Sequence, residues 1–220
     1  MENKVITVKG IGKVSAPPDL LVLELKLETV EPEYELAMRR SKEMLNALSD
    51  AIVSAGHDGK HLKTNRFNIS SKYENYRDKN NNYKSKFIGY ACTHDLRLEF
   101  DLDMKKLGAT LGAIASCEAN PTFKIKFSVK DADAVSAELL ENAIKNAKWK
   151  AEILARSAGV SLGAILRIDY NWGEINVYSK TDLYLAQEPI EEGAAAPMKM
   201  DIKPEDIDLN DTVTVVWAIV

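Results

Sequence analysis

The chain has 220 residues, 45% of them hydrophobic and 28% charged, so it is long enough to bury a core without metal ions or disulfide bonds. Its formal net charge of −4 provides no overall basic field, which argues against non-specific nucleic-acid binding. The two cysteines, Cys92 and Cys117, are too few for a disulfide framework and are expected to be buried thiols.

No stretch reaches the ~18 apolar residues that a membrane-spanning helix needs. The first residues run straight into a strand and lack the apolar core of a signal peptide. The sequence therefore predicts no membrane span and a cytoplasmic chain, exported only if a leader has been removed.

The first half of the chain predicts strands around one long helix. Residues 5–14 are β-branched and alternate, and Gly10 and Gly12 within them indicate a bulge or a close backbone approach. Leucines at every second position of 21–27 mark a strand with one buried face, and we expect a hairpin between these two runs. Pro32 begins a helix that ends at Ala55-Gly56.

The long strands 62–76 and 83–101 follow, joined at a run of asparagines. Strands of this length exceed the usual five or six residues, so we expect part of their hairpin to project past the domain body. Next come a short helix over 104–116 and a strand over 123–129.

The longest helix runs from a cap at Asp131 or Asp133 to Ala158-Gly159. A strand then reaches from Leu162-Gly163 to Tyr170, and an alternating strand closes the chain near residue 219. The helix carries small residues at four-residue spacing, which allow close packing onto a sheet: Ala143, Ala147, Ala151 and Ala155.

Residues 171–208 form a long excursion between the last two strands. Its part 187–208 holds seven acidic residues against two lysines and few large apolar groups, so we predict that it is flexible.

The order ββαββ-αβαββ, without a linker, predicts one α+β domain over residues 1–220. We expect a mostly antiparallel sheet, two long helices and one short helix packed largely on one face, and the projecting hairpin. The predicted core consists of Leu21, Leu23, Leu25, Leu96, Leu98, Phe123, Ile125, Phe127, Val213, Val215 and Trp217.

No catalytic, cofactor-binding or metal site is predicted. Gly10-Ile11-Gly12 is half of a dinucleotide fingerprint, but the third glycine that opens a helix is absent. His57 and His61 are four residues apart, yet glycines beside them break any helix, so we interpret the segment as a solvated turn.

Cys92 and His94 share a strand face, and a Cys-His pair for a small hydrolase or redox enzyme is the main alternative to a non-enzymatic protein. The favoured interpretation of His94 is a half-buried histidine in a packed sheet. On the other face Arg97 stands between Asp95 and Glu99, which is typical of a solvated or inter-subunit face.

The hairpin at 77–86 is the feature most like a nucleic-acid site, because tyrosines interleave with its basic residues Arg77, Lys79, Lys84 and Lys86. Its charge is small and its tip is rich in asparagine. A contact with a protein neighbour is the favoured interpretation, and weak nucleic-acid binding is the alternative.

Landmarks spread over almost the whole chain resemble those of the SIMPL-domain family. They are Ile6 to Val14 followed by Pro18-Asp19, Ala55-Gly56, Tyr73, Gly89-Tyr90, Ala155 with Gly159 and Leu162-Gly163, and Val213 to Trp217. The resemblance implies a relationship to bacterial periplasmic antigens, some of them linked to oxidative stress, and to a eukaryotic signalling adaptor. It also implies assembly into ring-like oligomers. The family offers no catalytic residues that could be assigned to positions of this chain.

The prediction that follows is a non-enzymatic, self-assembling scaffold or binding protein. We expect a homo-oligomer with an unidentified protein partner, no nucleic-acid partner, no cofactor and no metal, and a role in stress.

Overall fold

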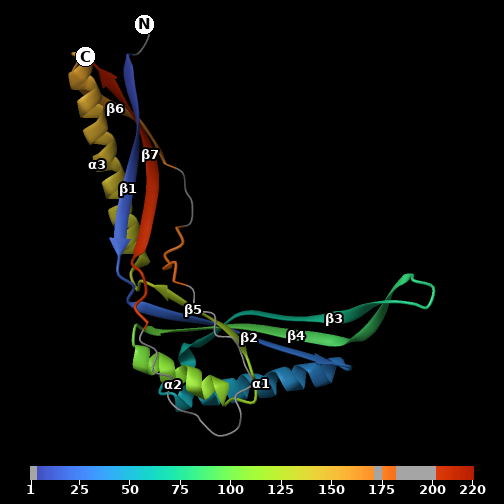
Figure 1. Cartoon of the computed structure of the whole chain (residues 1–220). Helices are drawn as coiled ribbons and strands as arrows, with labels where there is room; N and C mark the ends of the chain where they lie inside the picture. Colours follow the sequence, from blue (N-terminus) through green and yellow to red (C-terminus); the bar gives the residue numbers. More distant parts are fainter. Residues whose placement is uncertain (1–3, 171–174, 182–201) are drawn as a thin grey trace. The chain divides into compact units, whose positions relative to one another are not determined.

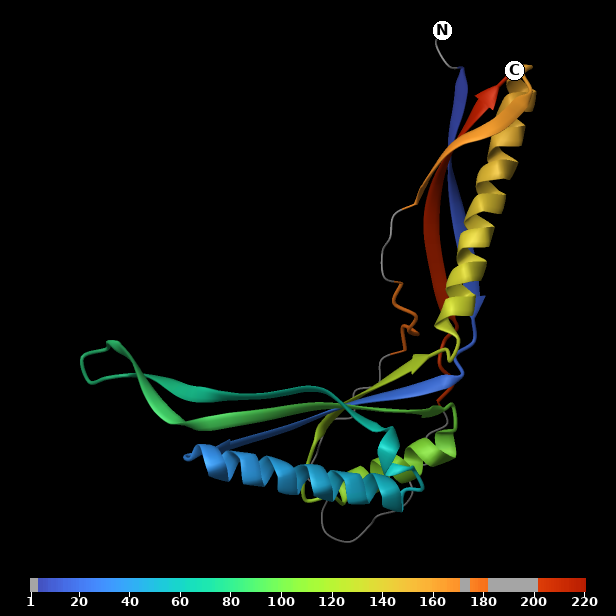
Figure 2. The same ribbon diagram turned by 180° about the vertical axis from the view of Figure 1, so that it is seen from behind.

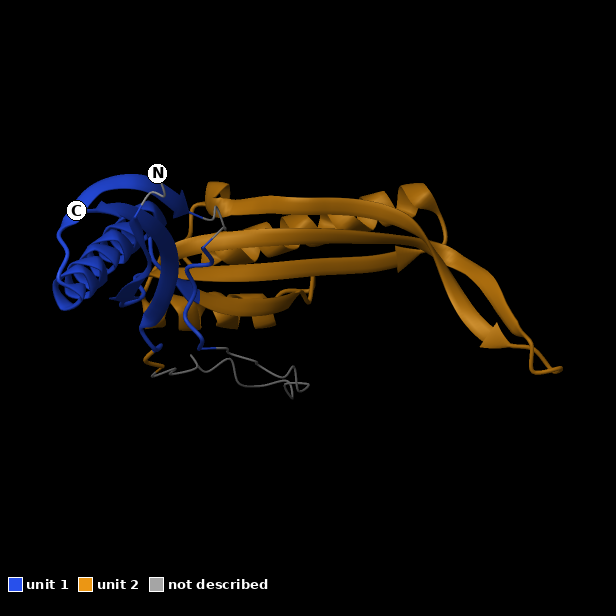
Figure 3. Cartoon of the chain, turned by 90° about the horizontal axis from the view of Figure 1, so that it is seen from above, with its two compact units in different colours: residues 1–19, 127–181, 204–220 blue, residues 20–126, 182–203 orange. Residues whose placement is uncertain are grey.

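The computed structural model describes residues 4–170, 175–181 and 202–220. The chain divides into two compact units, one of residues 1–19, 127–181 and 204–220 and the other of residues 20–126 and 182–203 (Figure 3). The prediction that residues 1–220 make one domain stays a prediction. The α+β class, the antiparallel pairing and the element order are confirmed, but the strands form two sheets rather than one.

The first unit is a three-stranded antiparallel sheet with one helix on it. Its strand order is β1 (Val5–Ala16), β7 (Ile207–Ile219) and β6 (Leu162–Tyr170), seen from behind in Figure 2. The helix α3 (Ala132–Ala158) lies along β1 and β7 (Figure 1). Its alanine row is buried against the sheet residues Val8, Val213, Val215 and Trp217.

Two glycines let α3 approach β1 closely. A Cβ added to Gly10 would lie 2.1 Å from the carbonyl oxygen of Ala143, and one added to Gly12 would lie 2.0 Å from that of Leu139. No side chain fits at these separations, so the helix backbone occupies the space that ordinary residues would fill. The expectation of a close backbone approach at Gly10 and Gly12 is confirmed.

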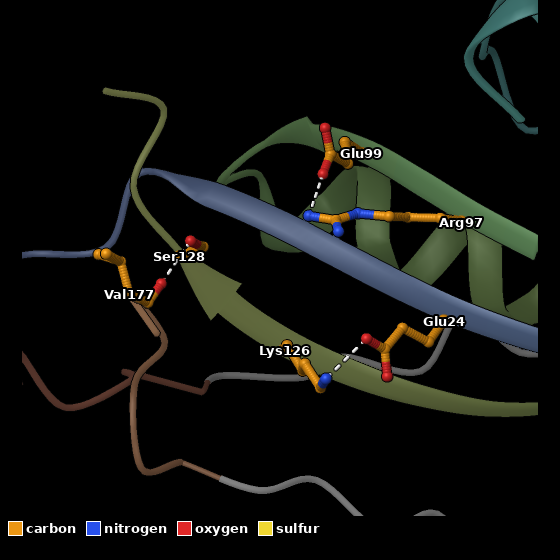
Figure 4. Close-up of polar contacts among 6 residues, drawn as sticks. All are labelled: Glu24, Arg97, Glu99, Lys126, Ser128 and Val177. Atoms are coloured by element: carbon orange, nitrogen blue, oxygen red, sulfur yellow. Dashed lines mark hydrogen bonds and ion pairs between the residues drawn. The ribbon is translucent and has the colours of Figure 1, made fainter. Parts of the chain in front are cut away.

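The ends of α3 follow from local chemistry. Asp131 is the cap, and its Oδ1 accepts a hydrogen bond of 2.8 Å from the Ala134 N–H. Gly159 ends the helix at φ 70°, a left-handed conformation that glycine adopts without strain. Beyond the sheet, Ser128 Oγ donates a hydrogen bond of 2.6 Å to the carbonyl oxygen of Val177 and so holds part of the long excursion (Figure 4).

The second unit is a four-stranded antiparallel sheet in the order β3 (Leu62–Arg77), β4 (Tyr83–Asp101), β2 (Leu20–Glu31) and β5 (Thr122–Ser128). The helices α1 (Tyr34–Ser54) and α2 (Met104–Ala115) lie on one face, as Figure 1 shows. A 3-10 turn over Gly59–His61 precedes β3. Leucines of β2 and β4 meet in the core, with Leu23 paired to Leu98 and Leu25 to Leu96.

Two sequence predictions need correction. The hairpin expected between residues 5–14 and 21–28 is wrong, because β1 pairs with β7 and β2 pairs with β4. Pro17 and Pro18 have a fixed negative φ and no backbone N–H, so this connection lacks the positive-φ residues that a tight hairpin turn favours. The predicted core is otherwise confirmed, although Phe123 is only half-buried.

The last strand begins earlier than predicted. β7 starts at Ile207, which is buried, so the last two residues of the segment 187–208 are part of a sheet. Residues 187–201 of that segment lie outside the described residues.

We expect Gly10→Ala to lower the free energy of unfolding by roughly 3 kcal/mol, because the new methyl group must displace the α3 backbone. Gly112→Ala in α2 is the matched control. A Cβ there has nothing within 4 Å, so the change should raise stability by about 0.5–1 kcal/mol through helix propensity. Urea denaturation of both variants measures the difference. Equal effects at the two positions would contradict the close packing at β1.

Candidate interaction surface

The strands β3 and β4 continue beyond the end of β2. β2 stops at Glu31, opposite Tyr90, whereas β3 and β4 remain paired as far as Arg77 and Tyr83. Residues 72–89 therefore form a two-stranded hairpin extension without a third strand beside it (Figure 1). The prediction of a projecting hairpin is confirmed.

The tip of the hairpin extension is ordered by its own side chains. Oδ1 of Asp78 accepts hydrogen bonds from the backbone N–H groups of Asn80 and Asn82, at 2.9 and 3.0 Å. Lys84 lies 3.0 Å from Oδ2 of the same carboxylate, and its hydrogen bond is the main cause that lowers the pKa of Asp78. Asn81 takes φ 64°, as expected of an asparagine in a tight turn.

A bulge decides which side chains face which way. The pairing jumps from Lys72 with Gly89 to Tyr73 with Phe87, so Ile88 is an extra residue. Gly89 has φ 143°, and a Cβ on it would lie 2.3 Å from the carbonyl oxygen of Glu31, so glycine is required there. Because side chains alternate along a strand, one extra residue places Phe87 instead of Ile88 on the same face as Tyr90.

Aromatic rings consequently form a continuous row on this face. The ring centroids are 5.6 Å apart for Tyr34 and Tyr90, 5.4 Å for Phe87 and Tyr90, and 5.6 Å for Tyr73 and Phe87. All three pairs are edge-to-face, a geometry that aromatic quadrupoles favour. The register places Tyr83 on the same face at the tip, under the guanidinium of Arg77 at 4.5 Å. We call these five aromatic residues the aromatic row.

The helix that covers this face of the sheet begins only at Tyr34, so most of the aromatic row is uncovered. The exposed fractions are 49% for Tyr34, 43% for Phe87, 58% for Tyr73 and 75% for Tyr83. An apolar row of this kind is typical of an interaction surface.

The hairpin extension is also basic. Five basic residues, Lys72, Arg77, Lys79, Lys84 and Lys86, stand against two acidic ones, Glu74 and Asp78. Arg77 and Lys84 are engaged at the tip, while Lys79 and Lys86 make no ion pair with the described residues. Sequence reasoning identified these charges and tyrosines, but it missed Phe87, Tyr90 and Tyr34, because the bulge that aligns them has no sequence signal except Gly89.

Cys92 and His94 lie on the buried face of β4 as predicted. Cys92 is 1% exposed, and a thiol so enclosed is a poor nucleophile for a dissolved substrate. His94 contacts Thr64, with 2.8 Å between Nε2 and Oγ1, and its ring stands edge-on to Phe67. Burial lowers the pKa of His94, and the nearby charge of Asp95 opposes that shift.

On the opposite face of this sheet, charged residues pair with one another. Arg97 forms an ion pair with Glu99, and Lys126 lies 2.6 Å from Glu24 (Figure 4). A shallow cavity of about 500 Å³ beside these pairs is lined by Lys26, Arg66, Asp95 and other residues. The ion pairing agrees with the interpretation of Asp95, Arg97 and Glu99 as a solvated face.

His57 does not lie in a solvated turn, which corrects the sequence prediction. Gly56 takes φ 87° and directs the chain inward, so that His57 is 5% exposed and its ring packs on Phe100 at 4.7 Å. His61 stays exposed. In the part of the chain that the structure describes, no three His, Cys, Asp or Glu side chains gather as metal ligands.

The hydrogen bonds of Thr110 determine which ring nitrogen of His57 carries the proton. Thr110 Oγ1 donates to the carbonyl oxygen of Lys106 at 2.7 Å, so it can only accept from Nε2 of His57, 2.7 Å away. Nδ1 is then the unprotonated nitrogen, and it is buried without a partner among the described residues. Burial, followed by the positive charge of Lys106, lowers the pKa of His57 below its ordinary value of 6.5.

We expect the free energy of unfolding to fall as the pH drops below about 6.5. The unfolded chain binds a proton at its ordinary pKa, while folded His57 resists it, so acid favours the unfolded state. Urea denaturation between pH 8 and pH 5 should show this slope, and His57→Gln should reduce it. His61→Gln, a change at an exposed histidine, should leave it unchanged. His94 contributes in the same direction, so part of the slope remains in the His57 variant. An identical slope in wild type and His57→Gln would contradict the assignment.

These features define an α+β protein whose most developed surface is the hairpin extension. A family model described as SIMPL, a protein of unknown function (DUF541), matches residues 6–217. The chain belongs to the SIMPL family.

Its relatives are bacterial proteins. It is similar to the 26 kDa periplasmic immunogenic protein of Brucella melitensis, with 29% identity over 163 residues, which cover 74% of this chain and 65% of that protein. The protein of the same name in Brucella abortus is 28% identical over the same shares. The uncharacterized protein YggE of Edwardsiella ictaluri is 21% identical over 98% of this chain and 87% of its own length. The matched region thus spans just under two thirds of each Brucella protein.

The cytoplasmic localisation expected from the first residues is corrected by these matches, because both Brucella relatives are named periplasmic proteins. Helices of the described part contain no apolar stretch long enough to cross a membrane.

Proposed function

We propose that this protein is a non-enzymatic scaffold of the periplasm that assembles into homo-oligomers and binds protein partners through its hairpin extension. A role in stress tolerance belongs to the same proposal. The periplasmic location is supported by the names of the two Brucella relatives.

The observation that carries the proposal is the uncovered aromatic row. A two-stranded ribbon alone is marginally stable in water, so a ribbon that also exposes Tyr73, Tyr83 and Phe87 gains from a covering chain. Aromatic side chains are enriched at the centres of protein interfaces, where they contribute most of the binding energy.

Charge supports a second copy as the covering chain. The hairpin extension has a net positive charge, whereas residues 187–208 of the sequence hold seven acidic residues against two lysines. A contact between two different surfaces of identical chains is head-to-tail, and it closes into a ring if its rotation permits.

Nucleic-acid binding by the same hairpin is less favoured. Arg77 is stacked on Tyr83, and Lys84 is paired with Asp78, so half of the basic residues at 77–86 are already engaged. The absence of enzymatic activity is proposed because Cys92 and His94, the catalytic pair of the alternative interpretation, are both buried.

We expect the wild-type protein to have a molar mass in solution that is a multiple of its 24.5 kDa chain. Tyr73→Ser with Phe87→Ser should shift the mass to that of the monomer, because the change removes two exposed rings from the aromatic row. The control is Ile165→Ser with Ile168→Ser, which removes two equally exposed apolar side chains from β6 and should leave the mass unchanged. Light scattering coupled to gel filtration measures all three. A monomeric wild type would overturn the proposed assembly, and deletion of residues 78–83 without effect would exclude the hairpin tip.

We also expect the assembly to weaken with salt. Raising the ionic strength from 0.15 to 1 M shortens the Debye length from about 8 Å to about 3 Å and screens the contact between opposite charges. Lys79→Glu with Lys86→Glu should mimic high salt and lower the mass at 0.15 M, whereas Lys145→Glu on α3 should not. Dissociation constants from sedimentation at both salt concentrations provide the comparison. An assembly that tightens with salt would point to a purely apolar contact.

A further inference from the structure

The edge of β1 is partly closed by side chains of α3. Among the described strands, β1 lies at the margin of its sheet and pairs with β7 alone, so every second residue directs its backbone groups away from the sheet. The N–H of Ile11 donates to Oδ1 of Asn146 at 2.9 Å. Asn142 Nδ2 donates to the carbonyl oxygen of Lys13 at 3.1 Å, and Lys150 Nζ donates to that of Lys9 at 3.0 Å.

The spacing of these bonds follows from the geometry of helix and strand. Four residues advance a helix by about 6.0 Å, and two residues advance a strand by about 6.6 Å. Asn142, Asn146 and Lys150 therefore meet successive outward-facing residues of β1 as the helix runs beside the strand (Figure 1).

The same row of the helix becomes apolar one step further on. The residue four positions after Lys150 is Leu154, and the next outward-facing residue of β1 is Thr7. The leucine side chain has no hydrogen-bonding group, so it offers no partner to the N–H and C=O of Thr7. The side-chain hydrogen bonds by which α3 covers the edge of β1 therefore end at Lys9.

A groove lies beside the open part of the edge. It has a volume of about 400 Å³ and is lined by Thr7, Val8, Lys9, Lys150, Ile153 and Leu154. Ile153 and Leu154 are 39% and 49% exposed, and Trp149, one helical turn before Ile153, is 59% exposed. The lining contains two lysines and no carboxylate.

We propose that the edge at Thr7 and this groove form a strand-addition site for an extended peptide segment with alternating apolar and acidic residues. The backbone of the peptide pairs with Thr7, its apolar side chains lie on Ile153 and Leu154, and its carboxylates meet Lys9 on the opposite side of the sheet. The alternating apolar and acidic residues of the peptide match the alternation of β1. The side chain of Val8 faces α3, whereas those of Thr7 and Lys9 face the opposite side of the sheet.

Charge favours an acidic peptide over a second copy of β1. Antiparallel pairing of two copies around Thr7 would set Lys9 of each chain opposite Val5 of the other, so neither lysine would meet a carboxylate of the added strand. The proposed site does not involve the hairpin extension, so it goes beyond the proposed assembly and can be tested separately from it.

The experiment measures fluorescence anisotropy of a labelled peptide, Ser-Glu-Val-Glu-Leu-Glu-Val-Ser, titrated with the full-length protein. We expect saturable binding that weakens about tenfold or more with Leu154→Glu, which places a negative charge in the groove and repels the carboxylates of the peptide. Ile165→Glu, at an equally exposed apolar residue of β6, is the matched control and should bind as wild type does. Circular dichroism of both variants verifies the fold.

N-methylated peptides test strand addition without altering the protein. Methyl groups on one alternate set of peptide nitrogens should abolish binding, and methyl groups on the other set should preserve it, because only one set faces β1. The proposal would be overturned if the two sets of methyl groups had equal effects, or if the labelled peptide did not bind. It would also be overturned if a peptide with lysine in place of glutamate bound as well as the acidic peptide. A dimer of the Tyr73→Ser, Phe87→Ser variant that Leu154→Glu dissociates would also overturn the proposal, since a second copy would then occupy the edge.

Discussion

The contact of the α3 backbone with β1 is the constraint on which the first unit depends. Gly10 and Gly12 leave room for the carbonyl oxygens of Ala143 and Leu139, and this nearness lets an alanine row cover the sheet without a gap. The same nearness brings the polar side chains of α3 within hydrogen-bond distance of the strand edge. The close approach of α3 to β1 is thus the cause both of the packing on the sheet and of the hydrogen bonds that protect the β1 edge. A side chain at Gly10 or Gly12 would disturb both.

In the second unit one inserted residue has a comparable influence. Without the bulge at Ile88, the lysines of β4 would continue the helix-facing side and Phe87 would lie opposite. The bulge places Phe87 on the helix-facing side of the ribbon and Lys84 and Lys86 on the other side, so the two sides differ in chemistry.

Most elements could be predicted from the sequence, because alternating leucines, asparagine turns and Asp or Gly caps act locally. The helix ends at Gly159 and the turn at Asn81 are of this kind. The partners of strands that are distant in the sequence could not be predicted: β1 pairs with β7, and nothing near β1 in the sequence indicates so distant a partner. The burial of His57 was missed because Phe100 and Thr110, which enclose it, come from remote elements. The charged tip was recognised, but the aromatic row required the bulge.

Among the described strands, β7 lies at the centre of the first sheet, and both of its neighbours pair with it alone. In sequence order it follows all of them. During synthesis, at roughly 5–20 residues per second, β1 therefore emerges about 10–40 s before its partner exists. Over that interval β1 stays an unpaired apolar strand, while the second unit, most of which is encoded between β1 and α3, can already form its leucine core. The first unit can close only after β7 has been synthesised, so its folding depends on whatever keeps β1 from other strands until then.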